Sequence, residues 1–270
     1  IAPFTSAADA AVRRAAFRTL GSLGGAAEVP LLVIATLAVE PGDERHAAER
    51  AVVAVCTKNP GHEEAAQVFL KIFQTSPEIA QQGLLPILGA IGGRPALAIV
   101  DDLIASPDPG KRMLGLEALA RWPDATVAPR LLERVETTRD QDERDLLLGA
   151  LIRIAPLPDN KLADAAKLDL VKRTMALCTT DAERARLVQR AGAIRTIDTL
   201  RFVVPRLDEA ALATAACQSV VELAHHRDLR DAHKAEFMAA LDKVIATTQD
   251  DEIVERARRY KEGKTWERKR

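Results

Sequence analysis

Aromatic side chains are scarce in this chain of 270 residues. Phe, Trp and Tyr together make up 3% of it, whereas Ala and Leu dominate an apolar fraction of 47%. Sheets are usually rich in aromatic and β-branched residues, so this composition favours closely packed helices. The apolar fraction is also large enough to build a stable core. The composition therefore predicts an all-α protein.

Net charge and long apolar runs are also lacking. The 38 basic and 39 acidic residues leave a net charge of -1, so the whole molecule exerts no general attraction on nucleic acid or anionic lipid. No apolar run reaches about 18 residues, which predicts no membrane span, and no signal peptide is evident. The chain begins at Ile1 rather than Met, which indicates a processed protein or an excised region.

The few cysteines lie far apart, each inside an apolar helical segment. Their odd number and wide spacing exclude a disulfide framework, and no basic residue pattern that would activate a nucleophile surrounds them. We expect buried structural thiols, and the compartment stays open. They are Cys56, Cys178 and Cys217.

Glycine-rich phosphate loops and the nucleophile elbow of hydrolases are missing as well. The glycine pairs Gly24-Gly25 and Gly92-Gly93 each follow one predicted helix and precede another, so helix termination explains them. We therefore expect no cofactor and no catalytic residue.

A two-helix unit repeats along the chain. In its first copy a helix is predicted from Ala8 to Leu23, with Val12, Ala16, Leu20 and Leu23 on one buried stripe. A second helix follows from residue 28 to 38, with a proline in its first turn, where no backbone donor is lost.

Seven such units are predicted. Their first helices close on residues 31 to 37 positions apart: Leu23, Val55, Ile91, Trp122, Ile154, Ala191 and Leu223. The later first helices are expected at Asp43–Lys58, Pro77–Ile91, Pro109–Trp122, Asp140–Ala155, Asp181–Ala191 and Asp208–His225, most opening on Asp or Pro. The later second helices are expected at His62–Gln74, Arg94–Ala105, Thr126–Thr137, Leu162–Cys178, Arg195–Val204 and Ala232–Thr247.

Each pair has too little area to bury its apolar stripe alone, so neighbouring pairs must stack. This predicts one elongated domain over residues 1–262, closed by a capping helix near 250–260, and a charged tail over residues 263–270. In the capping helix Ile253, Val254 and Ala257 are expected to face inward, and Arg256, Arg258 and Arg259 to face water.

Two blocks of the sequence resemble HEAT repeats. One runs Ala15-Phe17-Leu20-Gly21-Leu23-Gly24 and then Val29-Pro30-Leu31-Leu32, and the other runs Leu116-Ala118-Leu119-Trp122-Pro123-Asp124 and then Ala128-Leu131-Leu132. The resemblance spans nearly the whole chain and implies a right-handed α-α superhelix, a HEAT/armadillo-like solenoid of about seven antiparallel helix pairs.

A narrower resemblance concerns the order of a Trp-Pro-Asp turn, the helix segment Leu148–Arg153 and then a longer helix pair. This order resembles HEAT regions of exported bacterial multidomain proteins, where the repeats neighbour a sugar-active domain similar to keto-glycoside hydrolases, or a haem or dehydrogenase-like domain. The resemblance implies a scaffold in the periplasm or outside the cell, and it identifies no functional residue. The residues themselves leave a cytoplasmic location open.

Histidines are the first candidates for metal binding. His225, His226 and His233 lie near Asp228 and Asp231 at a predicted helix–turn–helix junction. They lack the His-x-x-x-His or His-Glu-x-x-His spacing that places ligands on one helix face, so we expect a solvated polar turn rather than a metal site.

A single His62-Glu63 pair resembles the pairs of di-iron HEAT proteins similar to deoxyhypusine hydroxylase, but those need several such pairs, and here the pair more simply starts a helix. His46 is the remaining histidine. Trp122, before Pro123-Asp124, is interpreted as a packed residue that ends a helix rather than a stacking platform.

Basic residues remain on the outward side of several predicted second helices, interrupted by Asp101 and Asp198. They predict a mildly basic ridge that binds a partner: Lys71, Arg130, Arg134, Lys172, Arg173 and Arg201. The function favoured is a non-catalytic protein-interaction or domain-positioning scaffold that binds through a concave second-helix face, with an acidic surface as partner. The alternatives are an enzyme-associated HEAT domain, glycosidase- or lyase-like, and a nucleic-acid-binding HEAT protein, which the balanced charge disfavours.

Overall fold

The structure is a computed structural model that describes residues 1–158 and 161–266. This part of the chain contains sixteen α-helices, four short 3-10 helices and no strand, which confirms the all-helical prediction. Its contacts cluster into two compact units that meet between Pro123 and Asp124 in the sequence. The single domain expected over residues 1–262 stays a prediction, and residues 267–270 of the expected tail lie outside the described residues.

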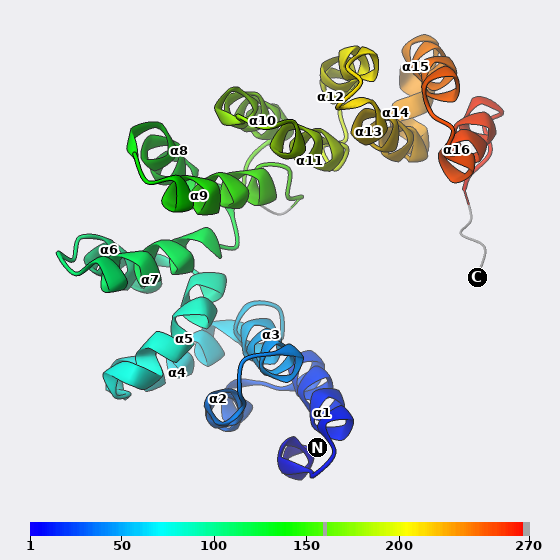
Figure 1. Cartoon of the computed structure of the whole chain (residues 1–270). Coiled ribbons are helices and arrows are strands. Elements are labelled where there is room, and N and C mark those ends of the chain that lie inside the picture. The colour runs from blue at the N-terminus through cyan, green and yellow to red at the C-terminus, as the bar shows by residue number, and fades with distance from the viewer. Residues whose placement is uncertain (159–160, 267–270) are drawn as a thin grey trace. The chain divides into compact units, whose positions relative to one another are not determined.

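The first unit begins with a 3-10 helix and holds seven α-helices in two layers. Helices α1, α3, α5 and α7 contact one another in succession, while α2, α4 and α6 lie against α3, α5 and α7 (Figure 1). The bounds are η1 Ala2–Ser6, α1 Ala10–Leu23, η2 Ala26–Glu28, α2 Val29–Ala38, α3 Asp43–Thr57, α4 His62–Thr75, α5 Glu78–Ile91, α6 Arg94–Ile104 and α7 Pro109–Ala120.

The buried face of α1 differs from the predicted stripe. Val12 and Leu23, both predicted to be buried, are 39% and 76% exposed. The core face also includes Phe17 and Gly21, because Gly21 lies directly against α3, where a Cβ would come 2.9 Å from the Ala51 Cα. The core face therefore centres on Ala16, Phe17, Leu20 and Gly21, and Val12 and Leu23 lie outside it.

The second unit holds the remaining helices in a similar arrangement. Helices α9, α11 and α13 contact in succession, and α13 also contacts α15 and α16 (Figure 1). The bounds are η3 Ala125–Val127, α8 Ala128–Thr137, α9 Gln141–Ile154, α10 Asp164–Leu177, α11 Asp181–Ala191, α12 Ile197–Val203, η4 Val204–Asp208, α13 Ala213–His225, α14 Arg227–Ala232, α15 Lys234–Thr247 and α16 Asp251–Lys261.

Two stretches of the second unit correct the sequence prediction. The first helix expected from Asp208 begins at Ala213, because Asp208 is the last residue of the 3-10 helix η4 and a turn separates it from α13. The polar turn expected around residues 226–233 contains the short helix α14. The buried residue of α14 is Arg230, which is 1% exposed. The sequence prediction missed this helix because it searched for buried apolar residues, and the buried residue here is an arginine.

Helix α16 lies where the capping helix was expected. The side chain of Asp250 accepts from the backbone N–H groups of Glu252 and Ile253, which starts the helix. Ile253 and Ala257 are buried as predicted, but Arg256, predicted to face water, is 19% exposed and packs beside Tyr260. The buried Tyr260 ring draws the guanidinium inward.

Within residues 1–158 and 161–266, none of the helices has the combination of length and hydropathy needed to cross a bilayer. This agrees with the absence of a predicted span.

Candidate functional site

A groove of about 980 Å³ lies in the first unit, formed by η1, α2, the α2–α3 turn and the starts of α1 and α3. Its floor is the outward face of α2, and its lining is mostly apolar. We call it the N-terminal groove. The residues that carry the argument below are Leu31, Ile34, Ala35, Ala38, Glu40 and Asp43.

Helix α2 is apolar on both of its sides. Leu32 and Val33 are buried in the unit, and the hydroxyl of Thr36 donates to the Leu32 carbonyl, which satisfies it inside the helix. On the opposite side Ile34 is 67% exposed and Leu37 is 37% exposed. A helix that is apolar all round normally lies in a core or against a partner, so the outward face of α2 is unusual for a surface in water.

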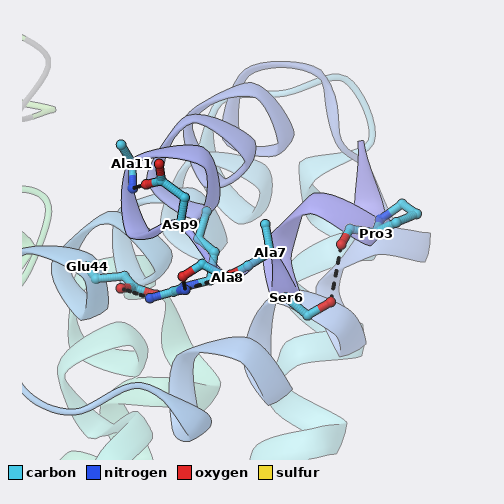
Figure 2. Close-up of polar contacts among 8 residues, drawn as sticks. Pro3, Ser6, Ala7, Ala8, Asp9, Ala11 and Glu44 are labelled. Atoms are coloured by element: carbon cyan, nitrogen blue, oxygen red, sulfur yellow. Dashed lines mark hydrogen bonds and ion pairs between the residues drawn. The ribbon is translucent and has the colours of Figure 1, made fainter.

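A bidentate ion pair between Arg13 and Glu44 forms part of the groove lining. The Arg13 Nε and Nη2 atoms donate to the Glu44 Oε1 and Oε2 atoms at 2.5 and 2.7 Å, joining α1 to α3. Arg13 Nη1 also donates to the carbonyls of Ala7 and Ala8, so the same side chain holds the η1–α1 link (Figure 2). Planar, charge-assisted contacts of this kind fix geometry well.

The ion pair also affects the ionisation of its carboxylate. The Arg13 hydrogen bond holds the pKa of Glu44 below its usual range, against an opposing effect of burial. Glu44 is therefore ionised at neutral pH, and the charge of Arg13 is compensated within the groove wall.

The remaining polar groups of the groove are simple. Thr5 and Ser6 donate their hydroxyls to the carbonyls of Ala2 and Pro3, as Figure 2 shows for Ser6. Neither histidine nor cysteine is among the residues that line the groove, and its titratable side chains are Arg13, Arg14, Glu40, Asp43 and Glu44.

Two arginines of the predicted basic ridge, Arg134 and Arg201, are paired with carboxylates. Arg201 donates from Nε and Nη2 to both oxygens of Glu236 at 2.9 Å and from Nη1 to Asp198 at 3.1 Å. The Arg134 Nε and Glu143 Oε1 atoms lie 3.0 Å apart as an ion pair, although they are not aligned for a hydrogen bond. These carboxylates offset the positive potential that the sequence assigned to the ridge.

The other ridge residues divide between the two units. Lys172 lies 3.9 Å from Asp169, and Arg173 is exposed on the same helix, α10. Arg130 lies on α8 and Lys71 on α4, both exposed. Partner binding by this set stays a prediction.

The histidine region is built around a tyrosine that the sequence analysis left out. The His225 Nδ1 atom lies 3.0 Å from the Tyr260 hydroxyl, and the ring of His226 stands edge-on to that of His225 at 5.7 Å. Asp231 is engaged by Arg227 and Arg230. Among the described residues no group of three potential ligands is placed to hold a metal ion.

The cysteines and Trp122 lie in the core. Burial raises the pKa of the Cys56 thiol to about 12 and of the Cys178 and Cys217 thiols to about 11, so none is an activated nucleophile. Trp122 is also buried, as interpreted from the sequence.

The groove escaped the sequence analysis because Leu31 and Ile34, which line it, are of the residue types that usually lie in a core. The available signal was the run Val29–Ala38, in which Thr36 is the one polar residue. An amphipathic helix shows a polar face, and this one has none.

Comparison with known proteins adds no relative. No protein-family model matches the chain, and none of the curated proteins is significantly similar to it.

Proposed function

We propose that this chain is a non-catalytic protein-interaction scaffold, a HEAT-like solenoid of antiparallel helix pairs, and that the N-terminal groove is a docking site for a partner helix. The observation that carries the proposal is the exposed apolar face of α2 inside a groove of about 980 Å³. The layered order of helices within each unit supports the solenoid, because stacked pairs expose a continuous face of second helices to which α2 belongs.

The groove favours an amphipathic helix over a small metabolite. Ile34, Leu31 and Ala38 offer apolar contact spread along α2, whereas a metabolite site needs convergent polar groups that fix orientation. The apolar face of such a helix, laid into an apolar groove, stabilises the complex by about 25 cal/mol for each Å² of apolar surface that it buries, and it does not require such polar groups.

The rim indicates a partner with a basic flank. Glu40 and Asp43 are exposed at the rim and form no ion pair with other described residues, and Arg14 is the opposing unpaired cation. Since Arg13 and Glu44 compensate each other, the rim carries a small excess of negative charge. A lysine or arginine beside the apolar stripe of the partner would contact these carboxylates.

The proposal differs from the basic-ridge prediction in its surface but keeps the second-helix face. The ridge arginines Arg134 and Arg201 already hold carboxylates of the same unit, and binding an acidic partner there must displace them. The groove needs no such exchange.

Site-specific photo-crosslinking tests the proposal. A photoreactive residue at Ile34, in cells that make the protein, should yield discrete adducts with a partner, and mass spectrometry should place the adduct on an amphipathic helical segment of that partner. Ile79 is the matched control, because it is 82% exposed on α5 and lies outside the groove.

A second variant checks the chemistry of the contact. Ala38→Asp introduces a charge at an exposed residue of α2 that lines the groove, and it should abolish the Ile34 adducts while leaving the helical circular dichroism unchanged. Equal adducts from positions 34 and 79, or none from position 34, would refute docking in the groove.

A further inference from the structure

A second hollow, in the other unit, collects positive charge. It has a volume of about 260 Å³ and lies where the segments following α9 and α11 meet the end of α13. Its lining includes the apolar residues 156–158, the cations Arg190 and Arg195, and the side chains of Glu222 and His226. We call it the arginine crevice.

Arg190 is oriented without being neutralised. Its Nε and Nη2 atoms donate to the carbonyls of Ile152 and Arg153 at 3.2 and 3.0 Å, in the last turn of α9. Carbonyl oxygens carry only partial charge, so they fix the plane of the guanidinium and leave its full positive charge in the crevice wall.

Arg195 and Glu222 complete the charge balance. Arg195 is exposed and forms no ion pair with any residue in the described part of the chain. Glu222 is the one carboxylate among the residues lining the crevice, and its Oε2 atom lies 3.3 Å from the Arg256 Nη2 atom, which offsets it. The crevice therefore carries excess positive charge.

The pKa of the His226 imidazole responds to the charge of the crevice. Its ring is half-buried, and burial lowers its pKa, as do the nearby charges of Arg195 and His225, against an opposing effect of Glu222. The imidazole is thus neutral at neutral pH. An anion placed beside Arg195 would remove part of the repulsion and favour the protonated ring.

We propose that the arginine crevice binds the oxyanion end of a small ligand, a phosphate or a carboxylate, between Arg190 and Arg195, with the apolar part of the ligand against residues 156–158. Guanidinium groups suit such oxyanions because their planar forks can donate two parallel hydrogen bonds, which Arg195 can supply. Arg190, whose Nε and Nη2 atoms already donate to carbonyls, contributes its charge and its Nη1 atom. The hollow is slightly smaller than a pocket for a drug-sized molecule, which fits a small ligand or the end of a larger one. This site is independent of docking in the N-terminal groove.

A titration followed by nuclear magnetic resonance tests the proposal. Inorganic phosphate and benzoate are each added to the full chain, with sodium chloride at equal ionic strength as the reference. We expect saturable shifts confined to the amides of residues 189–195 and 222–226. Saturation by phosphate identifies a phosphate site, and saturation by benzoate identifies a carboxylate site with an apolar wall.

Substitutions separate a site from general charge attraction. Arg195→Ala should weaken binding about tenfold, which corresponds to about 1.4 kcal/mol for the loss of a charge-assisted contact. Arg227→Ala is the matched control, because Arg227 is exposed, pairs with Asp231 and lies outside the crevice. Both side chains are exposed, so neither change should affect folding.

The His226 ring gives an independent readout. With the saturating anion its pKa should rise relative to chloride, and Arg195→Ala should remove that rise. The titratable and charged groups that act on the ring are Arg195, Glu222 and His225, and Arg190 lines the same crevice. Shifts from both probes that do not saturate, or that are unchanged in Arg195→Ala, would show general charge attraction and overturn the proposal.

Discussion

A tight contact between α5 and α7 depends on Gly89. This residue lies in α5 where it crosses α7, and a Cβ added to it would come 2.1 Å from the backbone oxygen of Ala118. Ordinary contact with a Cβ begins at 3.4 Å, and the atom it meets belongs to the backbone of a packed helix rather than to a flexible side chain. Gly89→Ala must therefore force α5 and α7 apart.

The magnitude follows from two opposing effects. Overpacking of a core costs about 1–3 kcal/mol, and the upper end applies here because a helix backbone has to move. Alanine is favoured over glycine inside a helix by up to about 1 kcal/mol, which offsets part of that loss. We expect a net destabilisation of about 2 kcal/mol, and a melting temperature lower by roughly 4–8 °C.

The matched control is Gly149→Ala. Gly149 lies inside α9, and a Cβ at this position would meet nothing within 4 Å. Only the helix preference acts there, so the free energy of unfolding should rise by up to about 1 kcal/mol. Urea unfolding of both variants, followed by far-ultraviolet circular dichroism, gives the comparison.

Opposite signs for the two glycines are the decisive result. If Gly89→Ala were as stable as the parent protein, or if both variants gained stability, the tight α5–α7 crossing would be wrong. A similar loss in both variants would instead show that helix preference and space do not govern these positions.

Three further predictions concern polar contacts. Asn59→Ala should cost about 1–3 kcal/mol in urea unfolding, because its buried amide donates to two carbonyls at the end of α1, at 2.8 and 3.1 Å, and a cost near zero would contradict this. The hydrogen bond from Arg13 is the main cause that lowers the pKa of Glu44 in the folded state. The ionised carboxylate therefore stabilises the fold fully above its unfolded-state pKa, and this stabilisation is lost as pH falls through the folded-state pKa. In this acidic window the melting temperature of Glu44→Gln should depend less on pH than that of the parent protein. Arg134→Glu should lower the melting temperature more than Arg134→Gln, because only the former sets a carboxylate against half-buried Glu143, and equal values would refute the pairing.

The helices themselves were accessible from the sequence. Several local signals mark the helices. They are N-cap residues such as Asp108 before α7, proline in the first turn of α2 and an apolar period of 3.6 residues. Most predicted helices match the observed ones within a few residues. Local hydrogen bonding sets these bounds, so a single sequence contains them.

The sites were not accessible in the same way. Which side of an apolar helix stays exposed depends on which neighbour covers it, and Ile34 and Leu32 are indistinguishable by type although one is exposed and the other buried. The pairing of charges also depends on distant residues, because Arg201 donates to Glu236, which lies 35 positions later in the chain.

The sequence by itself determined the all-helical architecture, because backbone hydrogen bonds, caps and apolar periodicity act between residues at most four apart. The tertiary structure decided the exposed face of α2, the pairing of the ridge arginines and the meeting of Arg190, Arg195 and His226 in one crevice. These depend on contacts between residues distant in the chain, whose geometry is set by how the helices pack, down to the 2.1 Å that separates a missing Cβ at Gly89 from the backbone of α7.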